Sequence, residues 1–187
     1  MAMLSDGEIR RAMEKGEIAI FGNDDLGIHI GSSSVDLHLH NGTKILQRGD
    51  AISVIDAEMD KMFVDYDGWD EITIYPGEFY IMSTVERIRF ANDIVGFVQG
   101  RSSLARLGIQ VHCAGFADAG FDGTITLEVT NLTHRPIIIP KNTRICQMVF
   151  ARTGKPAEVP YGENKKSKYQ GQRGPTLTRI NKDYGEK

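Results

Sequence analysis

The sequence has little of three things that would place it in a special class of protein: cysteine, long apolar runs and net charge. Its 187 residues include two cysteines, Cys113 and Cys146, each in an apolar or strand-like stretch. Two such cysteines favour buried reduced thiols over a disulfide framework. No apolar run approaches the roughly 20 residues that span a bilayer, and none follows a basic N-terminus. We therefore expect a soluble cytoplasmic protein with no membrane partner.

The charge balance excludes another class. The formal net charge is -3 and the pI is near 6.0, whereas nucleic-acid surfaces depend on concentrated positive charge that displaces counterions. We expect no nucleic-acid partner. A free nucleotide remains compatible, because one local basic cluster suffices to bind its phosphates. The length suits a single domain over residues 1–187, with residues 160–187 as a C-terminal lid or tail.

Short strands dominate the chain. A capping box at Ser5 and Glu8 begins a predicted N-terminal helix that ends at Gly16. Strand-like stretches separated by glycine and proline turns then recur at 18–21, 34–40, 72–75, 79–90, 94–98, 109–112, 124–130 and 144–151. Many short strands with few helices predict a mainly β, closed or sandwiched domain.

Residues 34–40 alternate between apolar and polar side chains. The polar face would carry Asp36, His38 and His40. Two histidines in this spacing could ligate a metal ion, but no third ligand has suitable spacing, so we expect an ordinary polar strand face and assign no metal site. Asp36 is expected to help hold the fold together. Asn41-Gly42 signals a tight turn, which predicts a hairpin between residues 35–40 and 43–47.

The most unusual chemistry lies between Gly100 and Asn131. The run Gly100-Arg101-Ser102-Ser103 precedes a short predicted helix, whose backbone N–H groups, hydroxyls and positive charge suit a phosphate. A serine pair in this position is more often only a helix cap. Taken alone, this motif is therefore weak.

Two further patterns in this stretch suit a nucleoside. Asp118 lies among small residues and glycines, between the rings of Phe116 and Phe121, which could stack on a base or a sugar. Residues 124–130 alternate at period two, so Glu128 shares one strand face with threonines. Such a strand is often just a solvated sheet face. A carboxylate on a rigid strand can also accept a proton, and together the three patterns favour catalysis.

Beyond Pro160 the chain is rich in lysine, glutamine and glycine and has no apolar periodicity. Composition alone leaves two alternatives open. The segment is either a disordered tail or a lid that becomes ordered on a substrate, with its cations pairing with phosphate oxygens.

Four motifs in order resemble the dCTP deaminase branch of the dUTPase-like superfamily, including its bifunctional dUMP-forming members: GRSSLARLG, AGFADAGFDG, ITLEVTN and SKYQGQRGPT. The opening LSDGEIRRAMEKGEIAI and the stretch SSSVDLHL also match, so the resemblance covers nearly the whole chain. It implies a distorted β-barrel or jelly roll with an N-terminal helix and one short internal helix. It also implies a homotrimer whose active sites lie where subunits meet.

The resemblance implies roles for individual residues. Glu128 would be the general base of deamination, and Asp118 would hold the 3′-hydroxyl. The triphosphate would be bound by Arg101, Ser102, Ser103 and Arg106. The C-terminal segment would cover the nucleotide with Tyr161, Lys168, Tyr169 and Gln172.

The implied reaction is hydrolysis of dCTP to dUTP and ammonia, coupled to hydrolysis of dUTP to dUMP and diphosphate. Zinc deaminases carry H-x-E and P-C-x-x-C motifs, and the sequence has neither. We therefore expect no zinc. Desolvation would raise the pKa of Glu128 toward a useful value, and Ser102 and Arg106 would position the attacking water. In the second step Asp118 would orient water, and Mg²⁺ held by the triphosphate would neutralise the leaving group.

Two departures from the family pattern leave questions open. Ala117 and Ala119 stand where many members have Ile or Val and Pro, and the loop between His112 and Gly115 is one residue shorter than in many deaminases. The role of His112, inhibition by dTTP and the balance of the two reactions therefore stay open. The alternatives are a dUTP diphosphatase alone and a non-catalytic, nucleotide-binding trimer.

Overall fold

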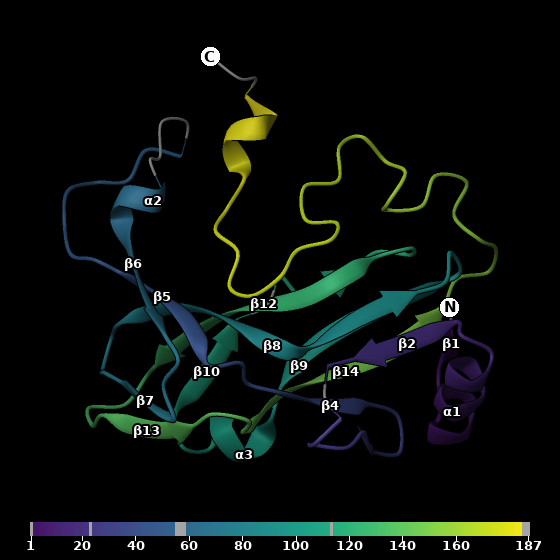
Figure 1. Ribbon diagram of the computed structural model, residues 1–187, viewed down its shortest axis with the longest axis horizontal. Coiled ribbons are helices and arrows are strands. Elements are labelled where there is room, and N and C mark those ends of the chain that lie inside the picture. The colour runs from purple at the N-terminus through teal and green to yellow at the C-terminus, as the bar shows by residue number, and fades with distance from the viewer. Residues whose placement is uncertain (1, 23, 55–58, 113, 185–187) are drawn as a thin grey trace.

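The computed structural model describes residues 2–22, 24–54, 59–112 and 114–184, and it is mainly β (Figure 1). One six-stranded antiparallel sheet runs in the order β11 (Phe116–Ala117), β9 (Ile94–Gly100), β14 (Arg144–Arg152), β4 (Val35–His38), β3 (His29–Ile30), with β1 (Ala2–Met3) on β14. The second runs in the order β10 (Ile109–His112), β12 (Asp122–Asn131), β8 (Phe79–Phe90), β5 (Gly42–Leu46), β6 (Phe63–Asp67), with β2 (Ile18–Phe21) on β8. A small sheet pairs β7 (Glu71–Ile74) with β13 (Ile137–Pro140).

The helices are short. Helix α1 (Asp6–Glu14) has the predicted capping box, in which Glu8 accepts hydrogen bonds from the backbone N–H and the hydroxyl of Ser5. Gly16 ends it with a positive φ of 69°, which glycine adopts without strain. The others are α2 (Met59–Met62), α3 (Ser102–Ala105) and the 3-10 helix η1 (Ile180–Asp183). The expected internal helix after Arg101 is confirmed as α3.

The predicted hairpin between residues 35–40 and 43–47 is wrong. β4 pairs with β14 and β3, whereas β5 pairs with β6 and β8 in the other sheet. The Asn41-Gly42 turn carries the chain from one sheet to the other, and the N–H of Gly42 donates to His40 Nδ1 at 3.0 Å. The chain does not reverse at this point. Leu39 lies opposite Thr84 and Ile45 lies opposite Tyr80, so the chain continues in one direction along β8.

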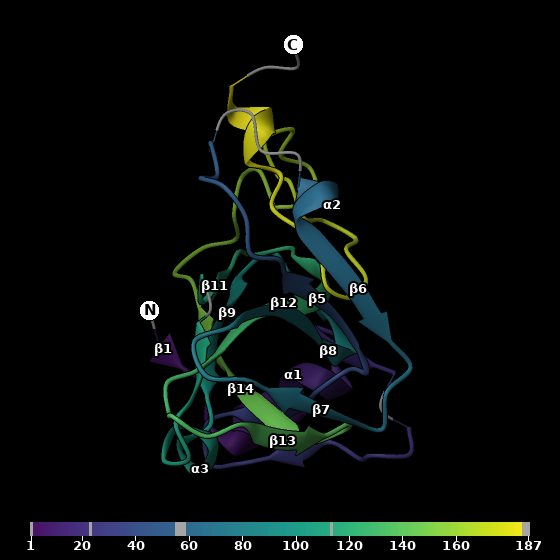
Figure 2. The same ribbon diagram turned by 90° about the vertical axis from the view of Figure 1, so that its left-hand side faces the viewer.

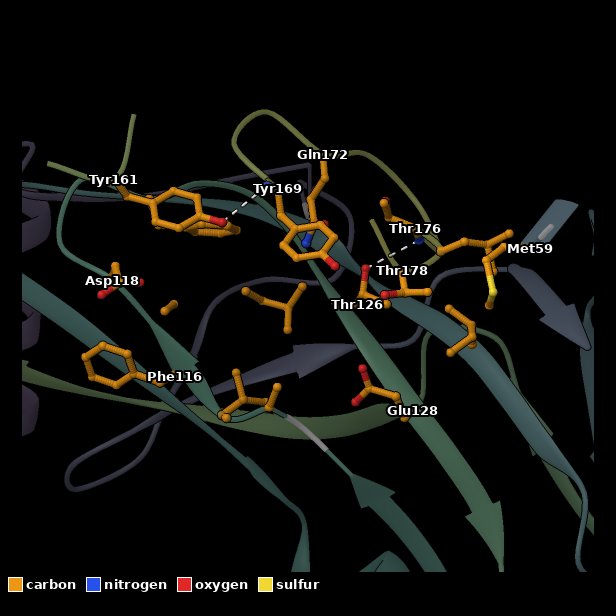
Figure 3. Close-up of a pocket in the computed structure, with 18 of the residues that line it drawn as sticks. Met59, Phe116, Asp118, Thr126, Glu128, Tyr161, Tyr169, Gln172, Thr176 and Thr178 are labelled. Carbon is orange, nitrogen blue, oxygen red and sulfur yellow. Dashed lines mark hydrogen bonds between the residues drawn. The ribbon is translucent and has the colours of Figure 1, made fainter. Parts of the chain in front are cut away.

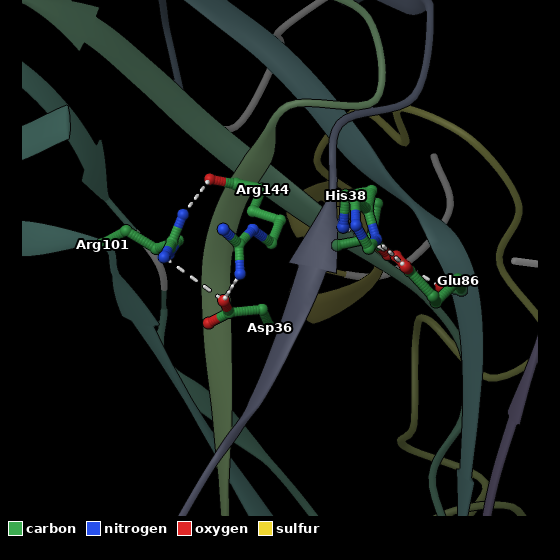
Figure 4. A network of polar contacts seen from close by, with 6 residues as sticks. Asp36, His38, Glu86, Arg101 and Arg144 are labelled. Carbon is green, nitrogen blue, oxygen red and sulfur yellow. Dashed lines mark hydrogen bonds and ion pairs between the residues drawn. The ribbon is translucent and has the colours of Figure 1, made fainter. Parts of the chain in front are cut away.

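His38 was expected on a polar strand face, and this expectation is also wrong. Its exposed fraction is 3%, and its Nδ1 lies 2.5 Å from Oε1 of Glu86, which is 0% exposed (Figure 4). The N–H of His38 donates to the other carboxylate oxygen of Glu86 at 2.9 Å. Because Leu37 is buried as well, both faces of β4 are covered. The contact links β4 in one large sheet to β8 in the other. Removing one partner would leave the other buried polar group without its hydrogen bond, which costs about 1–3 kcal/mol.

The chain after β14 forms an extended segment, residues 153–184, that passes over β12 (Figures 1 and 2). It is attached to the start of that strand by backbone hydrogen bonds. Gly171 N–H donates to the carbonyl of Asp122 at 2.7 Å, and Thr124 N–H donates to the carbonyl of Gln172 at 3.1 Å. None of the described helices has the length and apolar character required to cross a membrane.

Candidate active site

A pocket of about 540 Å³ lies between the two large sheets and under the C-terminal segment (Figure 3). Its size falls within the range of sites that hold small molecules. Strands β8, β9, β11 and β12 supply its walls, and the C-terminal segment supplies its cover. Six of the predicted site residues line it: Asp118, Phe121, Glu128, Tyr161, Tyr169 and Gln172.

Glu128 points into this pocket from the middle of β12 (Figure 3). The period-two pattern explains why. Leu127 and Val129 are buried in the core, so Thr126 and Glu128 turn to the opposite face. A β-bulge between Thr124 and Thr126 interrupts the alternation, and Ile125 lines the pocket as well. Glu128 lies opposite His112 of β10 on one side and Ile81 of β8 on the other. Hydrogen-bonded strands on both sides therefore fix the backbone that carries this carboxylate.

Asp118 follows β11 and lies on the other side of the pocket from Glu128 (Figure 3). Asp118 begins a tight turn, in which its backbone carbonyl accepts the N–H of Phe121 at 3.1 Å. Gly120 has a φ of 82°, and a Cβ there would lie 2.7 Å from Cβ of Pro160. Glycine is therefore required where the C-terminal segment crosses this turn.

The two aromatic rings beside Asp118 differ in exposure. Phe121, the predicted ligand, is only 6% exposed and packs against Phe90 and Tyr161 with centroid distances of 6.1 and 5.8 Å. Phe116 is 51% exposed and packs edge-on against Phe97. Phe121 thus forms part of the pocket wall, and Phe116 offers the open ring face. Of the two rings predicted to stack on a base or a sugar, Phe116 is the more accessible.

Thr126 is a polar pocket residue for which the sequence predicted no role. It lies two residues before Glu128 on the same face of β12, so period-two alternation was a sufficient signal. Its hydroxyl accepts the N–H of Thr176 at 3.4 Å (Figure 3). Thr126 therefore joins the strand that carries the carboxylate to the segment that covers it.

The cover is held by its own hydrogen bonds. Tyr161 Oη accepts the N–H of Tyr169 at 3.2 Å (Figure 3). Gln172 Nε2 donates to the carbonyl of Thr124 at 2.7 Å. Lys168, which was predicted to contact the nucleotide, forms an ion pair with Asp183 of η1 and does not line the pocket.

The predicted phosphate ligands lie elsewhere. Within the described chain, the pocket lining includes none of Arg101, Ser102, Ser103 and Arg106. Arg101 is the N-cap of α3, and Ser102, Ser103 and Arg106 are exposed. In two perpendicular views α3 lies at the end of the molecule opposite the C-terminal segment (Figures 1 and 2). One chain therefore does not bring the two groups of residues together.

An ion pair between Arg87 and Asp122 lies where the C-terminal segment is attached to β12. Arg87 Nε and Nη2 donate to the two carboxylate oxygens of Asp122, at the start of β12. The hydrogen bonds from Arg87 hold the pKa of Asp122 below its ordinary value. Asp122 also receives the N–H of Gly171 on its carbonyl, and its own N–H donates to Gln170 Oε1 at 3.1 Å. The ion pair thus lies where the segment is attached.

Residues 3–153 match the family model described as dCTP deaminase-like. The chain belongs to this family. Among its relatives, dCTP deaminase of Natronomonas pharaonis is 39% identical, with 97% of this chain and 96% of that protein covered. The dUMP-forming dCTP deaminase of Methanothermobacter thermautotrophicus is 42% identical, with 98% and 96% covered.

Solved structures of the dCTP deaminase and dUTPase types share the fold. The dCTP deaminase of Agrobacterium tumefaciens superimposes with a TM-score of 0.64 at 22% identity, over 81% of this chain and 48% of that one. The native EIAV dUTPase gives 0.50 at 20% identity, over 79% and 98%. The dUTPase-like fold expected from the sequence is therefore confirmed.

Proposed function

We propose that this protein hydrolyses dCTP to dUTP and ammonia, and hydrolyses dUTP further to dUMP and diphosphate, which supplies dUMP for thymidylate synthesis. The observation that carries the proposal is the carboxylate of Glu128, fixed on β12 and directed into a pocket of nucleotide size. Relatives named dUMP-forming dCTP deaminase, about 40% identical over nearly the whole chain, support it.

In the first step a water molecule attacks C4 of the cytosine. Glu128 takes a proton from this water and passes protons to N3 and to the departing amine, so that the C4–N bond breaks and ammonia leaves. A carboxylate held on a central strand suits this exchange, because it returns to the same position for each transfer. Phe116 would pack against the nucleoside, and Asp118 would hold its 3′-hydroxyl.

In the second step water attacks the α-phosphorus of dUTP and diphosphate leaves. Asp118 would orient that water. Among the residues that the structure describes, the pocket lining includes two carboxylates, Asp118 and Glu128, on different sides. This is too few for an all-protein magnesium cage but is compatible with Mg²⁺ held mainly by the triphosphate oxygens and water. Bound there, the ion would supply positive charge that neutralises the leaving diphosphate.

We further propose that the complete site needs a second copy of the chain, as in a homotrimer. The support is the separation of α3 from the pocket. Because Ser102, Ser103 and Arg106 are exposed at the far end of their own chain, a cyclic assembly can bring them to the pocket of a neighbour. There Arg101, Ser102, Ser103 and Arg106 would bind the triphosphate, with Ser102 and Arg106 also positioning the water attacking C4.

The test is product analysis with dCTP and Mg²⁺, with nucleotides separated by chromatography and ammonia measured in parallel. We expect ammonia and dUMP in equal amounts. Accumulation of dUTP would instead indicate a deaminase alone. Two relatives, from Natronomonas pharaonis and Haloarcula marismortui, carry the name dCTP deaminase, and they favour this alternative outcome. Hydrolysis of dUTP without ammonia release from dCTP, or dCTP binding without turnover, would contradict the proposal.

A further inference from the structure

Asp36 on β4 lies between two guanidinium groups that come from different parts of the chain (Figure 4). Its Oδ2 is 3.3 Å from Nη2 of Arg101 and 3.1 Å from Nη1 of Arg144. Arg101 Nη1 also donates to the backbone carbonyl of Arg144 at 3.4 Å. Arg101 is therefore held by two acceptors, one on β4 and one on β14.

The position of this carboxylate is itself fixed. Asp36 pairs in register with Gln147 of β14 on one side and with His29 of β3 on the other. Its side chain is 16% exposed. Because Asp36 is on a central strand and its side chain is mostly covered, its carboxylate has little conformational freedom. It can therefore hold the longer side chain of Arg101 in one orientation.

The contact with Asp36 matters most for the conformational entropy of the Arg101 side chain. An arginine side chain loses about 2 kcal/mol of rotamer entropy when it is immobilised. If the side chain is already ordered before an anion binds, that cost no longer weakens binding. Arg101 also occupies the N-cap position of α3, directly before Ser102 and Ser103, so an ordered guanidinium is held close to their hydroxyls.

Charge gives a second reason. Arg101 and Arg144 are both cationic and contact the same carboxylate oxygen, so without Asp36 they would repel each other at short range. With it, the trio carries one net positive charge and remains compact. Asp36 thus keeps Arg101 close to the start of α3, while enough positive charge is left to attract a phosphate group.

We propose that Asp36 is a positioning residue for phosphate binding: it orients Arg101 before the triphosphate arrives and does not itself contact the nucleotide. The inference rests on the proposed function, because Arg101 is assigned to the triphosphate there. It adds a residue on β4 that acts only through Arg101.

The test is a double-mutant cycle. In Asp36→Asn we expect the KM for dCTP to rise about tenfold, with kcat within about twofold of wild type, because the loss is in phosphate binding and not in proton transfer. In an Arg101→Ala background the same substitution should change KM by less than about twofold, because its target is gone. Asp70→Asn, which removes the exposed partner of Lys141, is the matched control and should leave KM unchanged.

An equal rise in KM with and without Arg101 would overturn the proposal, since Asp36 would then act through the fold as a whole. If Asp36→Asn lowers the melting temperature, Asp36→Glu keeps the charge but displaces it, and its effect on KM should again depend on Arg101. Calorimetric binding of tripolyphosphate to wild type and Asp36→Asn needs no turnover. Equal affinities there would refute positioning by Asp36, whereas a wild type that releases no ammonia from dCTP would refute the proposed function.

Discussion

The pocket and the α3 end of the molecule are built in opposite ways. In the pocket, Glu128 lies on a strand with ladder partners on both sides, and the chain's own C-terminal segment covers it. At the other end, Ser102, Ser103 and Arg106 in and beside the four-residue helix α3 are exposed to solvent, and Arg101 forms an ion pair with Asp36. Under the proposed function, one chain holds the general base in a covered pocket, and the residues proposed to bind phosphate lie exposed at the other end, where a neighbouring chain could use them.

The largest expected effect is at the pocket. Glu128→Gln keeps the size of the side chain but removes its ability to take a proton, so ammonia release from dCTP should fall by about 10³-fold. Affinity for dCTP, measured by calorimetry, should stay within about threefold, because most of the binding comes from other residues. Glu71→Gln, an exposed substitution on β7, is the control. Full deaminase activity in Glu128→Gln would refute the role of this carboxylate.

Mixing two inactive variants tests whether the two ends meet between chains. Glu128→Gln lacks the base, and Arg106→Ala lacks a predicted phosphate ligand. In randomly assembled trimers, a site built from neighbouring chains is complete in about one quarter of cases, so co-expression should restore about that share of wild-type ammonia release. If both residues act within one chain, no mixed trimer has a complete site. Activity no higher than that of the two parents would then contradict the shared site.

The sequence predicts most reliably what depends on local periodicity. The alternation of Ile125, Leu127 and Val129 placed Glu128 on the other strand face, and the structure confirms this orientation. The capping box at Ser5 likewise needs only four neighbouring residues. In both cases the physical cause lies within a few residues of the feature.

What the sequence did not predict depends on partners distant in the chain. His38 is buried because β8, far along the sequence, brings Glu86 against it. Asn41-Gly42 predicted a hairpin turn, but the chain continues in one direction along β8, which lies far along the sequence. For the site, motifs named Arg101 and Glu128 together, and only the fold shows that they lie apart in one chain.

The smallest expected effect concerns attachment of the cover, where Arg87 pairs with Asp122. Because the pKa of Asp122 is lowered in the folded protein, the pair contributes stability that is fully present above the unfolded value near 4 and is lost as the pH falls through the folded pKa. In urea denaturation, Asp122→Asn should lower the free energy of unfolding by about 1 kcal/mol at pH 7 and by less at pH 3. At pH 7 the variant should also show faster hydrogen exchange at Gly171, by a larger factor than at Leu127 in the middle of β12, where exchange follows global unfolding. An equal stability difference at both pH values would show that the carboxylate's charge does not anchor the cover.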